Sequence, residues 1–126
     1  MSFILEPIQG DDLQVNAWNW RPTLKFLHAE KVIDNNTFEL MGAQGCGGQA
    51  SSELCQRIAS VLAEKLKNMG PNDRIRFDLT TTVDPKQLAQ FGGDEPIDEV
   101  NLYSATYDWL ATFKDFCERC GGFRVV

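Results

Sequence analysis

The hydrophobic positions between residues 51 and 69 recur every three or four residues, the spacing of one face of an α-helix. They are Leu54, Ile58, Val61, Leu62, Leu66 and Met69, with polar and charged residues between them. Ser51 precedes the pattern as an N-cap residue, and Gly70 with Pro71 ends it. The pattern therefore predicts a helix over residues 51–68.

The last thirty residues carry the same spacing with a larger share of aromatic side chains. Their apolar stripe consists of Tyr103, Tyr107, Leu110, Phe113 and Cys117, widened by Val100, Trp109, Phe116 and Cys120. A helix over residues 101–120 with so many aromatic residues must be covered by other elements, so we expect it at the centre of the core. Gly121 can adopt the left-handed conformation that ends a helix, and residues 123–126 then form a short final strand.

Two further helices are predicted in the first half of the chain. The first spans residues 19–30 and would bury Trp20, Leu24 and Leu27. Asn19 is its expected N-cap, which places Pro22 in the first turn, where a missing N–H group is tolerated. After the turn at residues 34–36, Asn36 is expected to cap a shorter helix over residues 37–41.

The hydrophobic period changes to two in residues 75–83, which are rich in β-branched side chains and predict a half-buried strand. Residues 3–5 are a further short apolar stretch, read as an edge strand or as a tail laid over the core. The strand over residues 75–83 could pair with residues 123–126, although the sequence does not fix the pairing. These elements predict a mostly helical α+β fold with a small antiparallel sheet, in one compact domain spanning residues 1–126.

Composition and charge narrow the classes of function. A chain of 126 residues with 43% hydrophobic residues is long enough for one buried core. Its formal net charge of −6 repels phosphate backbones, so we expect no nucleic-acid binding, and the charge suits a basic protein partner. No apolar run approaches the roughly 20 residues that cross a bilayer, and no signal sequence is recognisable. We therefore expect a cytoplasmic protein that does not bind membranes.

Cys117 and Cys120 have the spacing of half a zinc site or of a redox pair. Cys46 and Cys55 would have to supply the other half of a zinc site, and their spacing is wide for that purpose. A redox pair normally lies at the start of a helix, where the dipole lowers the thiol pKa, whereas this pair lies at a helix end. Structural cysteines on the apolar stripe are the favoured interpretation, and we expect no metal and no cofactor.

Catalytic groups are scarce in the sequence. His28 is the single histidine, so the commonest general base is missing from almost every candidate site. The serines and threonines have no recognisable basic partner, and we predict no catalytic residue. The acidic residues at 94–99 fit no calcium loop and are interpreted as the solvated start of the C-terminal helix.

One candidate binding surface consists of Trp18, Trp20 and Arg21, residue types that are favoured at binding hot spots. The favoured alternative places Trp20 in the core, Trp18 over the helix entrance and Arg21 against a carboxylate.

A second candidate is the glycine-rich loop at residues 42–49, because Gly47 and Gly48 precede Ser51 at a helix N-terminus that could receive an anion. The loop lacks the lysine of phosphate-binding loops, and a loop that only needs positive φ angles is the favoured interpretation.

Residues 16–22 (NAWNWRP) and residues 113–123 (FKDFCERCGGF), together with the helix around Ile58, resemble a loose group of small bacterial proteins of uncharacterised function. The resemblance covers about a third of the chain. It implies that both ends belong to one compact domain and that the source is bacterial. It implies no activity, ligand or catalytic residue.

Two functional hypotheses follow. The leading one is a non-enzymatic interaction protein, an adaptor or an inhibitor of a basic partner such as a toxin, in an immunity-like role. The alternative is a small-ligand-binding domain or enzyme that uses the loop at residues 42–52 and the segment at residues 18–21 as one pocket. Binding by charge predicts strong salt dependence, whereas a pocket predicts thermal stabilisation by a metabolite.

Overall fold

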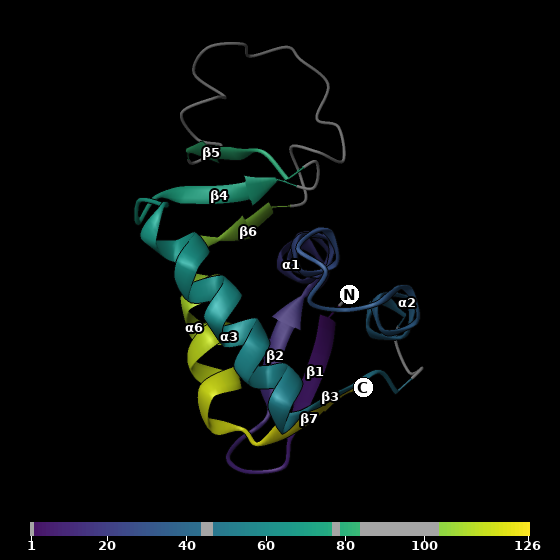
Figure 1. Ribbon diagram of the computed structural model, residues 1–126. Coiled ribbons are helices and arrows are strands. Elements are labelled where there is room, and N and C mark those ends of the chain that lie inside the picture. The colour runs from purple at the N-terminus through teal and green to yellow at the C-terminus, as the bar shows by residue number, and fades with distance from the viewer. Residues whose placement is uncertain (1, 44–46, 77–78, 84–103) are drawn as a thin grey trace.

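Helices and two antiparallel sheets make up the part of the chain that the computed structural model describes, residues 2–43, 47–76, 79–83 and 104–126 (Figure 1). The helices are α1 (Ala17–Ala29), α2 (Asn35–Gly42), α3 (Ser52–Lys67) and α6 (Tyr107–Arg119). The strands are β1 (Ser2–Pro7), β2 (Leu13–Asn16), β3 (Gln49–Ser51), β4 (Asp73–Arg76), β5 (Thr81–Val83), β6 (Ser104–Thr106) and β7 (Gly122–Val125). The predicted α+β class and antiparallel pairing are confirmed.

The larger sheet has the strand order β2-β1-β7-β3, and α3 and α6 run side by side in front of it (Figure 1). Every second residue of its strands is buried, as the pleat of a one-sided sheet requires, namely Phe3, Leu5, Val15, Ala50, Phe123 and Val125. Residues 3–5 therefore lie in an inner strand and not at an edge as the sequence suggested. The edges are β2 and β3, which the sequence did not predict because each is short and largely polar.

The smaller sheet, with the order β5-β4-β6, corrects the prediction of one continuous strand over residues 75–83. Leu79 adopts a positive φ of 72°, and its N–H donates to the Arg76 carbonyl at 2.8 Å, so the chain reverses and β5 pairs back onto β4. The other neighbour of β4 is β6 and not residues 123–126, so the suggested pairing was also wrong.

The C-terminal helix begins later than the predicted residue 101, because residues 104–106 form strand β6. Thr106 is its N-cap and accepts from the Trp109 N–H at 3.0 Å. Of its predicted stripe, Tyr107 is partly buried and Val100 and Tyr103 lie outside the described residues, whereas five residues of the helix are buried as expected: Trp109, Leu110, Phe113, Phe116 and Cys117. The fully buried Trp20 ring lies edge-on to Phe113, with ring centres 5.4 Å apart, and joins α1 to this stripe.

The helix caps in the first half differ from the prediction. Asn16, and not Asn19, caps α1, accepting from the Asn19 N–H at 3.0 Å, so Pro22 lies in the second turn. Asp34, and not Asn36, caps α2. In both runs several Asn or Asp residues compete, and the one with extended backbone dihedrals becomes the cap. The side chain of Asn19 instead accepts from the Thr106 N–H at 3.1 Å and ties α1 to β6.

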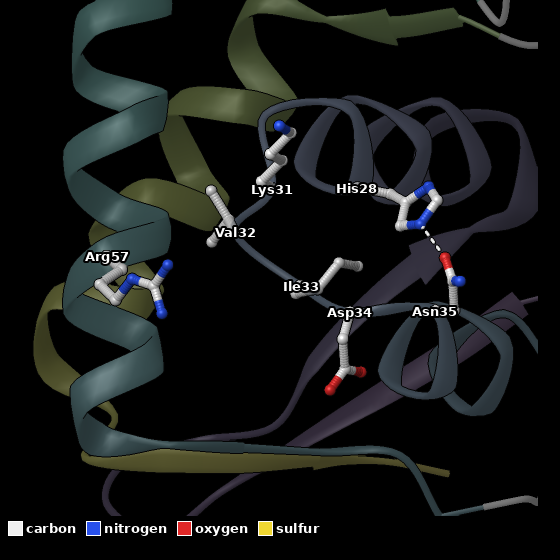
Figure 2. Close-up of a pocket in the computed structure, with 7 residues that line it drawn as sticks. All are labelled: His28, Lys31, Val32, Ile33, Asp34, Asn35 and Arg57. Atoms are coloured by element: carbon white, nitrogen blue, oxygen red, sulfur yellow. Dashed lines mark hydrogen bonds between the residues drawn. The ribbon is translucent and has the colours of Figure 1, made fainter.

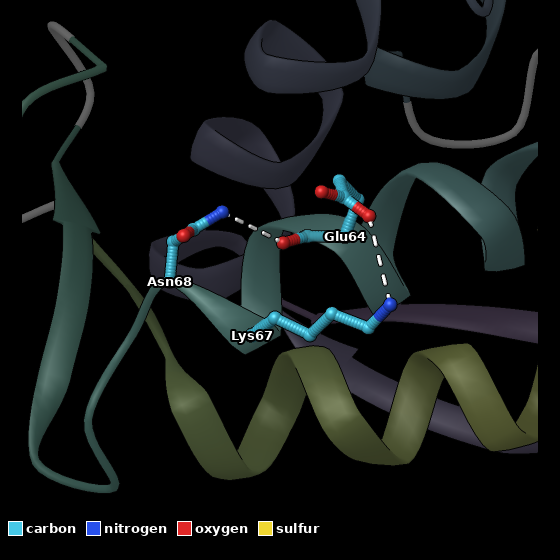
Figure 3. Close-up of polar contacts among 3 residues, drawn as sticks. All are labelled: Glu64, Lys67 and Asn68. Atoms are coloured by element: carbon cyan, nitrogen blue, oxygen red, sulfur yellow. Dashed lines mark hydrogen bonds and ion pairs between the residues drawn. The ribbon is translucent and has the colours of Figure 1, made fainter.

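Helix α3 matches its predicted range closely. Ser51 caps it, accepting from the Leu54 N–H at 3.1 Å. At its other end the Asn68 amide donates to the Glu64 carbonyl at 3.1 Å, and Lys67 lies 3.7 Å from the Glu64 carboxylate (Figure 3). The ion pair is well exposed and contributes little, whereas the amide satisfies a carbonyl that the helix end leaves free.

Candidate functional site

A pocket of about 490 Å³ lies where the end of α1, the start of α2 and the outer face of α3 meet. We call it the α1–α2 pocket. It is lined by His28, Lys31, Val32, Ile33, Asp34, Asn35 and Arg57 (Figure 2). Val32 and Ile33 are buried, whereas Lys31, Asp34 and Arg57 are exposed. Its volume lies within the range of small-molecule sites, and its lining is mainly polar, with Val32 and Ile33 as the apolar residues.

Two cations from different elements line this pocket, and the Lys31 side chain points away from Arg57 (Figure 2). Arg57 extends from α3 towards the segment that joins α1 to α2, and Lys31 belongs to that segment (Figure 2). Within the described part of the chain neither side chain has an ion-pair partner, whereas Lys114 and Arg124 elsewhere are paired with carboxylates. Their positive charge is therefore available to a ligand, in a chain whose net charge is −6.

The backbone holds Lys31 in an uncommon conformation, with a φ of 61°. Its N–H donates to the His28 carbonyl at 3.0 Å, and the Val32 N–H donates to the Leu27 carbonyl at 2.9 Å. This is the Schellman arrangement that ends a helix, and its left-handed position is usually glycine. Lysine there is strained, and strained residues concentrate at functional sites.

The acidic group of the pocket, Asp34, and its imidazole, His28, both form hydrogen bonds to α2. The backbone N–H of Thr37, 2.7 Å from the Asp34 carboxylate, lowers the pKa of Asp34, so this group stays ionised at neutral pH. His28 Nε2 is hydrogen-bonded to the Asn35 side-chain oxygen, and its ring stacks on Phe38 with centres 4.7 Å apart.

The structure places the predicted binding residues Trp18, Trp20 and Arg21 in different surroundings. Trp20 is fully buried, and its Nε1 donates to the Met41 carbonyl at 2.9 Å. Trp18 is 41% exposed and Arg21 is exposed, and neither lines the α1–α2 pocket.

Gly48, at the end of the glycine loop, packs against the Trp20 region. A Cβ on Gly48 would lie 2.7 Å from the Met41 backbone nitrogen, so only glycine fits beside the residue that Trp20 binds. Gly47 has a φ of 74°, as a loop glycine was expected to have. The exposed Ser51 is occupied as the α3 cap.

The sequence did not identify Lys31 or Arg57 as site residues. Arg57 is one of the polar residues between the apolar positions of the predicted helix, and it is exposed as that pattern implies, but its nearness to Lys31 depends on the tertiary fold. Lys31 follows the helix end that the sequence predicted at residue 30. The predicted helix end was the one available signal that a residue of positive φ follows, because no glycine stands there.

Three of the four cysteines are free, buried thiols in the core: Cys55, Cys117 and Cys120. Cys120 Sγ donates to Cys55 Sγ at 3.6 Å. Among the described residues, no group of three or more His, Cys, Asp or Glu side chains is arranged to hold a metal ion. Cys46 and the acidic residues at 94–99 lie outside the described residues.

Comparisons of the chain with protein-family models, with characterised proteins and with solved structures found no match. In the part of the chain that the structure describes, no helix combines the length and apolar character needed to cross a membrane.

Proposed function

We propose that this protein is a small-ligand-binding module whose site is the α1–α2 pocket and whose ligand is a small anion. The observation that supports this most directly is the presence of Lys31 and Arg57 on one pocket, each without an ion-pair partner in the described part of the chain. Arginine binds carboxylate and phosphate in a two-pronged geometry, and lysine adds a point charge. The ligand-binding hypothesis is kept, and its site moves from the loop at residues 42–52 to this pocket.

The other polar groups of the pocket narrow the chemistry of the ligand. Asp34 is ionised and therefore accepts hydrogen bonds only. A ligand that places its anionic group between Lys31 and Arg57 should offer a hydroxyl or amino donor to this carboxylate. The apolar base of Val32 and Ile33 suits a short carbon chain between the two. Small hydroxy acids, amino acids and phosphorylated polyols share this pattern.

The test is a thermal-shift and calorimetric titration with citrate, glycerol phosphate and phosphoserine, against sodium chloride at matched ionic strength. A ligand at a hundredfold excess over its Kd stabilises the folded state by about 2.7 kcal/mol. We expect at least one probe to raise the melting temperature in this way, with chloride having no comparable effect.

Two variants assign the binding to the pocket. Arg57→Gln removes the guanidinium and is expected to raise Kd roughly tenfold or more, because a hydrogen bond to a charged group contributes about 1.5–3 kcal/mol. Arg21→Gln is the matched control, since Arg21 is an exposed arginine that does not line the pocket. Equal loss of binding in both variants would show only general charge attraction and would refute the site.

A second candidate function is supported by how charge is distributed along the chain. Residues 84–103 contain five acidic residues and one lysine, so −4 of the net charge of −6 falls in this segment. An acidic stretch of this kind favours a basic protein partner in an adaptor or inhibitor role. Co-purification from the native cell at low and at high salt tests it: a basic partner should be retained at low salt and lost at high salt.

A further inference from the structure

The three buried cysteines bring thiols from two helices together at one end of the α3–α6 pair. Cys55 lies near the start of α3, Cys117 in the last turn of α6 and Cys120 just after that helix ends. All three are fully buried. The sulfurs of Cys55 and Cys120 are 3.6 Å apart, and a disulfide bond is about 2.05 Å long, so a closure of roughly 1.5 Å would join them.

The surroundings distinguish the roles of the two sulfurs. The hydrogen bond from the Cys117 thiol, followed by the Cys120 thiol and the Gly122 N–H, lowers the pKa of Cys55 to about 7 against the effect of burial. The positive end of the α3 dipole acts in the same direction. Burial raises the pKa of Cys120 to about 11, so this group keeps its proton at neutral pH. Cys55 is therefore the thiol that attacks the oxidant, and Cys120 is the thiol that then attacks the oxidised Cys55.

One exposed turn is hydrogen-bonded to the backbone beside Cys120. The Gln9 N–H donates to the Cys120 carbonyl and the Ile8 N–H to the Gly122 carbonyl, both at 2.9 Å. The Ile8 side chain is 75% exposed. Because a short surface turn opens at lower cost than a packed core, we expect opening at this turn to be the route by which a reagent as small as a peroxide reaches the sulfurs.

We propose that Cys55 and Cys120 form a reversible disulfide when the protein meets a peroxide. The Cys55 thiolate attacks one oxygen of hydrogen peroxide, which breaks the O–O bond, forms a sulfenic acid and releases hydroxide. The Cys120 thiol attacks the sulfenic sulfur, the S–S bond forms, the S–O bond breaks, and the thiol proton leaves with the hydroxyl as water. Two electrons pass from the cysteine pair to the peroxide, and a dithiol reductant reverses the change by exchange.

The test maps disulfides in the intact protein after brief treatment with hydrogen peroxide, followed by alkylation and peptide mass spectrometry. We expect a linked Cys55–Cys120 peptide, the loss of two titratable thiols, and full recovery with dithiothreitol. Linkage of Cys55 to Cys117 or to Cys46 would overturn the assignment, and so would the absence of any linkage in the folded protein.

Two variants sharpen this result. Cys120→Ala should abolish the linked peptide and allow Cys55 to oxidise further to the sulfinic acid. Cys117→Ala removes the hydrogen bond that contributes most to the lowered pKa of Cys55, so the Cys55–Cys120 link should still form, but more slowly. If Cys120→Ala does not fold, the peptide map of the unmodified chain decides the question alone. If the link formed only in the denatured chain, or equally well in the folded and the denatured chain, a role for the folded geometry would be refuted.

Discussion

Cys55 and Arg57 lie two residues apart on α3, yet their surroundings are opposite. Successive residues of an α-helix are about 100° apart around its axis, so these two side chains point roughly 200° apart. Cys55 faces α6 and is fully buried, with its neighbours fixed by packing. Arg57 is exposed at the α1–α2 pocket. On the buried face a few neighbours set the reactivity of a thiol, whereas on the exposed face a cation is available to a ligand and is screened by salt.

The largest expected difference between the two faces is in stability. Phe113 is fully buried and contacts Trp20, Trp109 and Phe123, so Phe113→Ala should lower the free energy of unfolding by about 3–5 kcal/mol. Arg57→Gln, on the exposed face, should stay within about 0.5 kcal/mol of the unmodified chain. Urea denaturation measures both. A loss below about 1 kcal/mol for Phe113→Ala would show that the apolar stripe is not the centre of the core.

The pH dependence of stability should report on the buried thiols. Cys55 has a pKa of about 7 in the folded chain, against the ordinary cysteine value of 9.0 that applies when the chain is unfolded. Between pH 7 and 9 the unfolded chain therefore binds more protons, and stability rises with pH. Cys120, whose pKa is about 11, stays protonated when the unfolded thiol ionises, so stability falls above pH 9. The raised pKa of Cys117, caused first by its hydrogen bond to Cys55 and then by burial, adds to that fall.

Urea midpoints measured from pH 7 to 11 in the presence of a reductant should therefore pass through a maximum near pH 9. We expect the rise to be on the order of 1 kcal/mol. Cys55→Ala is the control: it should remove the rising limb and lessen the fall above pH 9, because Cys55 contributes to the raised pKa of Cys117 and of Cys120. A midpoint that falls steadily from pH 7 in the unmodified chain, and equally in the variant, would contradict the assignment of Cys55 as the acidic thiol.

The smallest expected effect concerns Lys31, where stability and binding should change in opposite directions. Lys31→Gly relieves the positive φ and should stabilise the fold by about 0.5–1 kcal/mol, the strain of a left-handed residue less the added freedom of glycine when unfolded. The same change removes a cation from the pocket and should weaken anion binding. Melting curves with and without the anion separate the two effects. Tighter or unchanged binding would exclude Lys31 from the site.

The sequence predicted the elements whose patterns are long. The three-and-four spacing of residues 51–68 gave α3 nearly to the residue, and the aromatic stripe around Phe113 is buried as expected. Turns and short strands were harder, because their determinants are local and weak. Nothing in the β-branched run at residues 75–83 marks Leu79 as a residue of positive φ, so the hairpin there read as one strand.

The candidate site could not be predicted from the sequence, for a different reason. Lys31 and Arg57 are 26 positions apart and belong to no common motif, so only the tertiary fold brings them to one pocket. The same holds for Cys55 and Cys120, which hydrogen-bond although 65 residues separate them. Sequence spacing drew attention to Cys117 with Cys120 on one helix, whereas the third thiol comes from the start of another.

The tryptophans allow folding of the protein to be followed by intrinsic fluorescence. Trp20 and Trp109 are buried with ring centres 6.4 Å apart, whereas Trp18 is 41% exposed. Separating α1 from α6 must hydrate both buried indoles at once, so intrinsic emission should shift to longer wavelength in a single step that follows the opening of that junction. Trp18, already 41% exposed, should change less than the two buried indoles, and the kinetics of folding can be followed without an added label.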